Sequence, residues 1–398
     1  MMRTDVVVTG IGCLGPWGIG LPALAAALQR GEPLGRPVDR SAGYHRPHSA
    51  TLVGSCGELD LAPWLSPKAA RRMSDMSQFG VATAHMGLHD AGLVGMDGER
   101  SAITVSTAFG PSGFTELLAR QILEKGGKAA SPFLFTDCVA NAAAGQIAID
   151  LGSRGPNTTI CAREAGPLLA IGHAANDINL GRVDRSLAGS IDEMKALTHA
   201  ILDRFRALAR PHCDGELPRP FDRRRAGILA AEGATLLVLE AASAARARGA
   251  RILARVGGHA HAFDPTAGRA SFGHGASALA ATLQQQLGPR LGEVDVVVSG
   301  ASGARRGDAL EAEVLRTALP HRPPVLVPKA VHGEYGGGTL AAAMLALRGA
   351  EFAHPSACSE PDAALGINPA SGRITGRRVL CSALASGGGA AWLILEAP

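Results

Sequence analysis

Glu164 is the residue around which the chemistry of this chain can be organised. It follows a β-prone run, Thr158–Cys161, and precedes a helix that we expect to begin at Pro167, a residue well tolerated in a first helical turn. A strand, a sharp turn and a buried helix present one side chain at a helix N-terminus, where the macrodipole stabilises a carboxylate or a thiolate. Cys161 is a possible nucleophile three residues earlier, but a buried structural role in the strand is the simpler interpretation.

The elements that must position Glu164 follow an α/β pattern in which buried helices alternate with apolar strands. We expect helices over Leu21–Arg30, Met73–Gly92, Ser277–Leu287, Asp308–Leu319 and Gly338–Arg348. We expect strands over Asp5–Gly10, Ala102–Thr107, Val183–Gly189, Gly233–Glu240, Arg251–Gly258, Val294–Gly300, Val325–Val331, Val379–Ala383 and Ala390–Leu395. Each half begins with an apolar strand, and this duplication predicts two domains, residues 1–250 and 251–398. A plain α/β protein without duplication is the alternative.

Composition excludes several classes of function. The 398 residues carry a net charge of +4, only 19% are charged and 4% are aromatic, so a nucleic-acid partner is not expected. No apolar stretch reaches the roughly 18 residues of a membrane span, and the N-terminus resembles no signal peptide. The seven cysteines show no C-x-x-C spacing, which favours reduced, buried thiols in the cytoplasm and no metal site.

The glycines of Gly10-Ile-Gly12 could begin a dinucleotide-binding turn. No acidic residue follows a clear second strand about 20 residues on, as that motif requires. We therefore expect no nucleotide or other cofactor.

The chain resembles the β-ketoacyl synthases of the thiolase superfamily nearly from end to end. The segment VVVTGIGCLGPWG is similar to the N-terminus of these enzymes, and Ser131-Pro-Phe followed by Asn141 is similar to the segment before their nucleophile. The segment Arg219-Pro-Phe-Asp222 with Gly227 resembles their R-P-[FW]-D-x-x-R-x-G. The resemblance implies a thiolase fold, in which two duplicated α/β halves form a five-layered αβαβα core.

Four motifs that supply or gate condensation in this family are altered here. Alignment from Gly155-Pro156 to Ile171–Ala175 places Glu164 at the position of the nucleophilic Cys. The first catalytic His, in H-G-T, becomes Gly300 when Asp308 and Glu311 are aligned. The second, in K-[ST]-x-x-G-H, becomes Glu334, while Lys329 is kept and His332 lies two residues too early. The gating Phe of the C-terminal glycine-rich turn becomes Ala385.

These losses resemble chain length factors, the non-condensing partners of ketosynthases in type II polyketide and aryl-polyene systems. The resemblance implies a heterodimer with an active ketosynthase, or a homodimer, and an acyl carrier protein as partner. It implies a substrate tunnel or interface formed by Phe114, Leu117, Leu118, Phe133, Phe135 and Ala385. For each of the phenylalanines and leucines among them, ordinary core packing is at least as good an interpretation.

Two other interpretations of the altered pocket stay open. If the fold holds, Glu164, Lys329, His332 and Glu334 lie near one another, and a repurposed enzyme could use them for decarboxylation or other acyl-thioester chemistry. Alternatively, these groups form only a buried ion-pair network that maintains the fold. A pure binding module for carrier protein or acyl chains is a third class. The sequence names neither the acyl substrate nor the partner.

Overall fold

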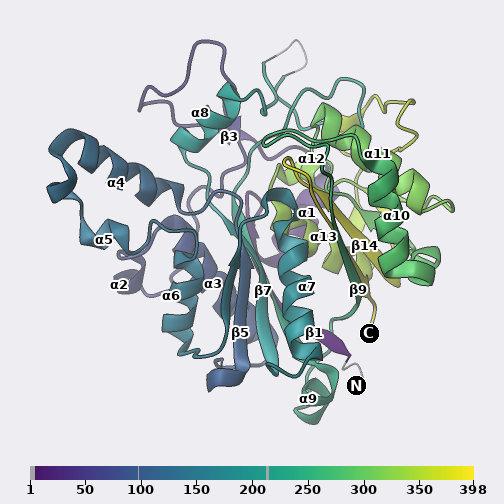
Figure 1. Ribbon diagram of the computed structural model, residues 1–398, viewed down its shortest axis with the longest axis horizontal. Helices are drawn as coiled ribbons and strands as arrows, with labels where there is room; N and C mark the ends of the chain where they lie inside the picture. Colours follow the sequence, from purple (N-terminus) through teal and green to yellow (C-terminus); the bar gives the residue numbers. More distant parts are fainter. Residues whose placement is uncertain (1–4, 97, 212–214) are drawn as a thin grey trace.

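The computed structural model describes residues 5–96, 98–211 and 215–398. Within these ranges one mixed sheet runs in the order β11-β10-β14-β15-β9-β1-β8-β7-β5-β6 (Figure 1). The strands before residue 250 are β1 (Val6–Gly15), β5 (Ser101–Ser106), β6 (Asn157–Ile160), β7 (Arg185–Asp192) and β8 (Gly233–Ala241). Those after it are β9 (Ala254–Phe263), β10 (Val296–Val298), β11 (Val325–Leu326), β14 (Arg378–Leu384) and β15 (Gly389–Glu396).

The two sets of strands repeat one topology. In the first set β8 lies antiparallel between β1 and β7, and β5 and β6 follow in parallel. In the second set β15 lies antiparallel between β9 and β14, and β10 and β11 follow in parallel. The sets meet where β1 pairs with β9, at Val7 and Val8. The expected duplication is therefore present, and a domain boundary near residue 250 stays a prediction.

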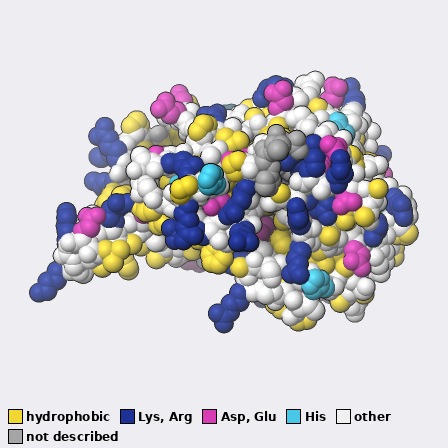
Figure 2. Space-filling view, turned by 90° about the horizontal axis from the view of Figure 1, so that it is seen from above, with side chains coloured by type: hydrophobic (Ala, Val, Ile, Leu, Met, Phe, Trp, Pro, Cys, Tyr) yellow, Lys and Arg dark blue, Asp and Glu magenta, His cyan; other side chains and the backbone are white. Residues whose placement is uncertain are grey.

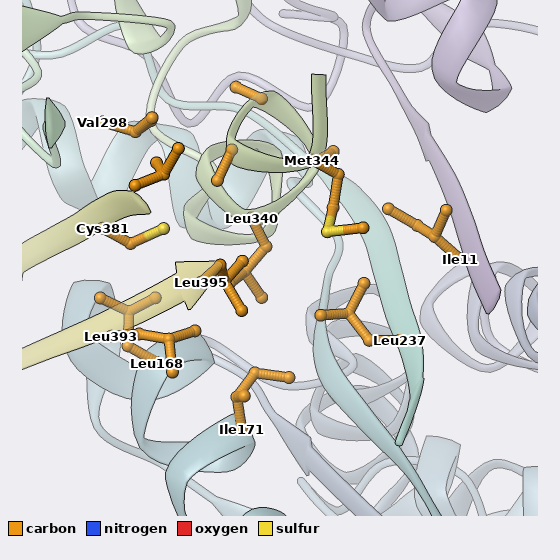
Figure 3. Packing of buried hydrophobic residues seen from close by; sticks show 14 of the residues in the cluster. Ile11, Leu168, Ile171, Leu237, Val298, Leu340, Met344, Cys381, Leu393 and Leu395 are labelled. Atoms are coloured by element: carbon orange, nitrogen blue, oxygen red, sulfur yellow. The ribbon is translucent and has the colours of Figure 1, made fainter. Parts of the chain in front are cut away.

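Helices complete five layers around these strands. Between the two halves of the sheet lie α7 (Gly166–Asn179) and α13 (Gly336–Leu347), which contact strands of both sets and each other. The outer faces are covered by α3 (Asp75–Asp90) with α6 (Ala142–Leu151), and by α10 (Ala276–Leu287) with α11 (Arg305–Ala318). Figure 3 shows the central layer, in which Leu168 and Ile171 of α7 and Leu340 and Met344 of α13 meet residues of the strands. The predicted αβαβα thiolase fold is confirmed.

Close packing explains the glycines of the first strand. A Cβ atom added at Gly10 would lie 2.3 Å from the carbonyl oxygen of Gly87, and one at Gly12 would lie 2.1 Å from that of Thr83. These positions therefore let α3 approach β1 closely. The G-x-G pattern has a packing role here.

One expected strand is wrong over most of its length. The expected strand Val325–Val331 ends at Leu326, and Lys329–His332 form a short helix, α12. Pro328 before it has helical dihedral angles, φ −62° and ψ −25°, so the chain turns before Lys329. Because of this turn, Lys329 and His332 leave the sheet and lie in α12, where the His332 ring packs against the start of α13. The other expected helices and strands overlap observed ones.

The remaining helices lie at the periphery, and α4 with α5 projects on the left of Figure 1. They are α1 (Gly20–Arg30), α2 (Pro67–Ala70), α4 (Ser112–Lys125), α5 (Pro132–Phe135), α8 (Ala196–Arg204) and α9 (Ala242–Ala247). In the described part of the chain, every helix is too short or too polar to cross a membrane.

Candidate functional site

The turn before α7 positions Glu164. After β6 ends at Ile160, one turn of 3-10 helix, Arg163–Ala165, leads directly into α7. Arg163 has a left-handed φ of +49°, which makes the reversal sharp enough to bring the next side chain to the helix start. Gly166 then packs so closely that an added Cβ would lie 2.9 Å from the Cβ of Ser106. Glu164 thus lies at the helix N-terminus, as the sequence predicts.

The carboxylate of Glu164 is held by the glycine-rich turn between β14 and β15. The backbone N–H of Ser386 donates to Oε2 at 3.2 Å, and the Ser386 hydroxyl donates to Oε1 at 3.2 Å. The backbone N–H of Glu164 itself also interacts with the carboxylate. Arg163 fixes the same turn, because its guanidinium donates to the Ser386 carbonyl at 2.9 Å. Backbone donors of the glycine-rich turn and of the 3-10 turn before α7 are therefore already engaged by a side chain of the protein.

Lys329 and Glu334 form a buried ion pair beside Glu164. Lys329 is 1% exposed, and its Nζ contacts Oε1 of Glu334, whose side chain is 10% exposed. The backbone N–H of Glu334 donates to Leu229 at 2.7 Å, which fixes the segment between α12 and α13. An added Cβ at Gly336 would lie 2.7 Å from Cγ of Pro167, so the starts of α13 and α7 are in contact. Glu164 and Glu334 therefore share one site.

The environment favours a proton on Glu164. Burial, followed by repulsion from the Glu334 carboxylate, raises the pKa of Glu164 from 4.5 to about 7, against the opposing effect of Lys329. Near neutral pH this half-buried carboxyl group exchanges between its acidic and basic forms. Of the predicted site residues, Glu164, Lys329 and Glu334 are brought together.

His332 packs against Trp17 and the start of α13. Its ring packs edge-on against Trp17, with 5.5 Å between ring centroids, and it is fully buried. Within the described residues neither ring nitrogen has a hydrogen-bond partner. Burial and then the Lys329 charge lower the pKa of His332 to about 3, so the ring stays neutral. The His332 ring is therefore a neutral, buried group that packs against Trp17 and the start of α13.

Two further carboxyl groups adjoin the site that sequence reasoning did not single out. Asp192 accepts hydrogen bonds from Thr107 Oγ1 at 2.9 Å and from the Ala108 N–H at 2.6 Å, and burial raises its pKa to about 7. Glu311 accepts from Ser299 Oγ at 2.9 Å, and burial raises its pKa. The signal for Glu311 was its retention in the segment aligned with Asp308, next to the altered Gly300.

The two other altered positions, Gly300 and Ala385, are tightly packed. An added Cβ at Gly300 would lie 2.6 Å from the Ser382 carbonyl oxygen, so the backbone leaves no room for an imidazole. Ala385 is 4% exposed, and its N–H donates to the Gly389 carbonyl at 2.7 Å. Cys161 follows the end of β6 and is exposed, which contradicts the expected buried role in the strand.

Most residues predicted for a tunnel lie on the projecting arm of α4 and α5. Leu118 is buried and Phe114 is half-buried, with its ring centroid 6.0 Å from that of Phe133. The others are open to solvent, at 49% for Leu117, 44% for Phe133 and 63% for Phe135. The packing interpretation therefore fits Leu118 alone, and the exposed members form an apolar surface of the arm.

Comparisons with known proteins agree on one family. Residues 3–245 match the model of the β-ketoacyl synthase N-terminal domain. A putative polyketide β-ketoacyl synthase 2 of Streptomyces halstedii is 31% identical over 331 residues, covering 81% of this chain and 79% of that protein. The tetracenomycin polyketide synthase ketoacyl synthase beta subunit of Streptomyces glaucescens is 30% identical over 385 residues. This match covers 91% of this chain and 90% of that protein. The solved structure of the ishigamide ketosynthase/chain length factor is 27% identical, has a TM-score of 0.88 and covers 100% of both chains.

The matched domain and these relatives show that the chain belongs to the β-ketoacyl synthase family. Within that fold the turn that leads into α7 carries the carboxyl group of Glu164.

Proposed function

We propose that this protein is a non-condensing, chain-length-factor-like subunit that pairs with an active β-ketoacyl synthase in a type II polyketide, aryl-polyene or fatty acid pathway. One observation carries the proposal: the Glu164 carboxyl group occupies the turn that leads into α7, where Ser386 and its own backbone N–H hold it. An acyl chain has no thiol to join there, and a carboxylate would give a labile mixed anhydride. The imidazole positions are Gly300 and Glu334, so decarboxylation lacks its usual assistance.

The surface supports a protein partner on the side of the arm. The exposed side chains of the α4–α5 arm include Leu123 at 86% and Phe135 at 63%, and Ile149 of the neighbouring α6 is 77% exposed. Monomers seldom expose such a group of large apolar residues without an interaction partner. The adjoining strand β6 ends the sheet, and in the described residues no strand pairs with its outer edge. An apolar arm beside an open strand edge fits a partner subunit of the same fold.

A basic rim supports an acyl carrier protein as the second partner. Gly387 lies beside the Arg163 guanidinium and the backbone carbonyl of Arg269, and both arginines are exposed near the turn that holds Glu164. Figure 2 shows Lys and Arg side chains gathered over the middle of the upper face of the molecule. Guanidinium groups recognise phosphate through paired hydrogen bonds, so this rim suits the phosphate-linked arm and acidic surface of a carrier protein.

Reconstitution tests the proposal. We expect the purified chain to form a stable 1:1 complex with the active ketosynthase encoded beside it. Alone with malonyl- and acyl-carrier proteins it should give no condensation product by mass spectrometry, and the complex should give the full-length chain. A persistent monomer or homodimer in the presence of that ketosynthase, or an acyl thioester trapped on the isolated chain, would contradict the proposal.

A repurposed acid–base enzyme is the second candidate, and the pKa of Glu164 near 7 favours it. In this case Glu164 exchanges a proton with substrate, while Lys329 stays in contact with Glu334. We would then expect the isolated chain to decarboxylate malonyl-carrier protein with a rate that falls at least 100-fold in Glu164→Gln. An unchanged rate in that variant, or no turnover, removes this candidate.

A further inference from the structure

A separate pocket lies at the opposite end of the sheet from β6. It opens between the C-terminal end of α11, the strands β10 and β11, and the chain around Gly366, and its volume is about 160 Å³. Its floor is apolar and consists of Val297, Leu315, Leu319, Val325 and Ile367. None of the residues of the Glu164 site lines it.

The charged side chains that line this pocket are two arginines. Arg316 and Arg322 line it and are exposed, and in the described part of the chain neither forms a salt bridge. Arg316 is held loosely, with Nη1 3.5 Å from the carbonyl oxygen of Ala364. Arg322 has a left-handed φ of +51°, and its N–H donates to Leu319 at 3.0 Å, which fixes its backbone beside the opening. Among the described lining residues none is acidic.

Size and charge together select one class of ligand. A cavity of about 150 Å³ lined by apolar side chains takes up a molecule as large as benzene. Two arginines that line such a cavity and, among the described residues, form no salt bridge complement a carboxylate, which accepts paired hydrogen bonds. We propose that this pocket binds a small monocarboxylate with a compact apolar body, of the size of benzoate or hexanoate. The site is independent of the proposed partner subunit.

Methyl NMR of the full chain tests the proposal directly. Benzoate should shift the methyl signals of Val297, Leu315, Leu319, Val325 and Ile367 in a saturable way, with millimolar or tighter affinity for so small a ligand. Benzyl alcohol, which has a similar body without the charge, should bind at least tenfold more weakly. Equal binding of benzyl alcohol, shifts that do not saturate, or shifts centred on other methyl groups would overturn the proposal.

Two double variants distinguish binding at this pocket from non-specific attraction of benzoate to surface arginines. Arg316→Gln with Arg322→Gln should weaken benzoate at least tenfold. Arg204→Gln with Arg206→Gln is the control, because Arg204 also lies in the last turn of a helix and Arg206 also has a left-handed φ, of +58°. Equal weakening by both pairs, or none by either, would overturn the proposal. If the first pair unfolds the chain, the exposed Arg322→Gln alone should still weaken benzoate measurably, and no effect would again overturn it.

Discussion

At the scale of single residues, the decisive feature is a carboxyl group that the fold prefers to keep protonated. The pKa of Glu164 is about 7 in the folded chain against 4.5 ordinarily. A group whose folded pKa is raised stabilises the fold fully below about pH 4.5, and this contribution is lost as the pH rises through about 7.

The variant Glu164→Gln should remove this pH dependence. We expect its free energy of unfolding, relative to the unaltered chain, to rise by roughly 1–3 kcal/mol between pH 5 and pH 8, since one pKa unit corresponds to about 1.4 kcal/mol. Urea unfolding at four pH values measures it. The exposed Glu58→Gln is the control and should show no such trend. Parallel pH profiles for Glu164→Gln and the unaltered chain would contradict the raised pKa.

The Lys329–Glu334 pair gives a second prediction at this scale. Lys329→Met leaves a nearly buried carboxylate without its cation, and we expect a loss of about 3–5 kcal/mol of stability. Adding Glu334→Gln should recover about 1–3 kcal/mol of that loss, because the uncompensated charge is gone. A double-mutant cycle by urea unfolding measures the coupling. Additive effects of the two substitutions would mean that the pair is not formed.

At the scale of elements, the start of α13 packs closely against the His332 ring of α12, and this contact positions the segment that carries Glu334. A Cβ added at Gly338 would lie 2.5 Å from Cε1 of the buried His332 ring. Helix propensity alone would make Gly338→Ala stabilising, by about 1 kcal/mol. Overpacking should win, and we expect a net destabilisation of roughly 1–3 kcal/mol.

The control for this prediction is Gly145→Ala in α6. Apart from its chain neighbours and the backbone of its own helix, no described atom lies within 4 Å of the added Cβ. We therefore expect stabilisation of about 0.5–1 kcal/mol. Thermal unfolding of both variants compares them. A stabilised Gly338→Ala would show that α13 and the His332 ring are less tightly packed.

The elements themselves were largely predictable, because periodic apolar runs mark them. The position of Glu164 followed from a strand, a turn and Pro167, which are local features. The direction of His332 was not predictable, since it depends on where α12 turns after Pro328 and on Trp17, over 300 residues earlier in the chain. The short length of β11 was missed because Val327 continues an apolar pattern although the backbone has already turned.

At the scale of the whole molecule, the apolar arm should decide assembly. Leu123→Ser with Phe135→Ser removes two exposed side chains, so the stability of the single chain should change by less than about 1 kcal/mol. Affinity for the ketosynthase partner should fall at least tenfold, because apolar anchors dominate such interfaces. Analytical ultracentrifugation measures it. The control is Val94→Ser with Phe205→Ser, which are exposed elsewhere at 100% and 71% and should leave affinity unchanged.

The two ends of the sheet are protected unequally, and this has a cellular consequence. Beyond β11 the chain passes alongside, with Val325 bridged to Pro369, whereas no strand of the described residues pairs with the outer edge of β6. Copies made in excess of their partner would expose a template for strand addition, which invites aggregation and capture by chaperones and proteases. Under the proposed function, the amount of this protein in a cell should therefore follow the supply of the partner subunit, which favours matched synthesis of the two chains.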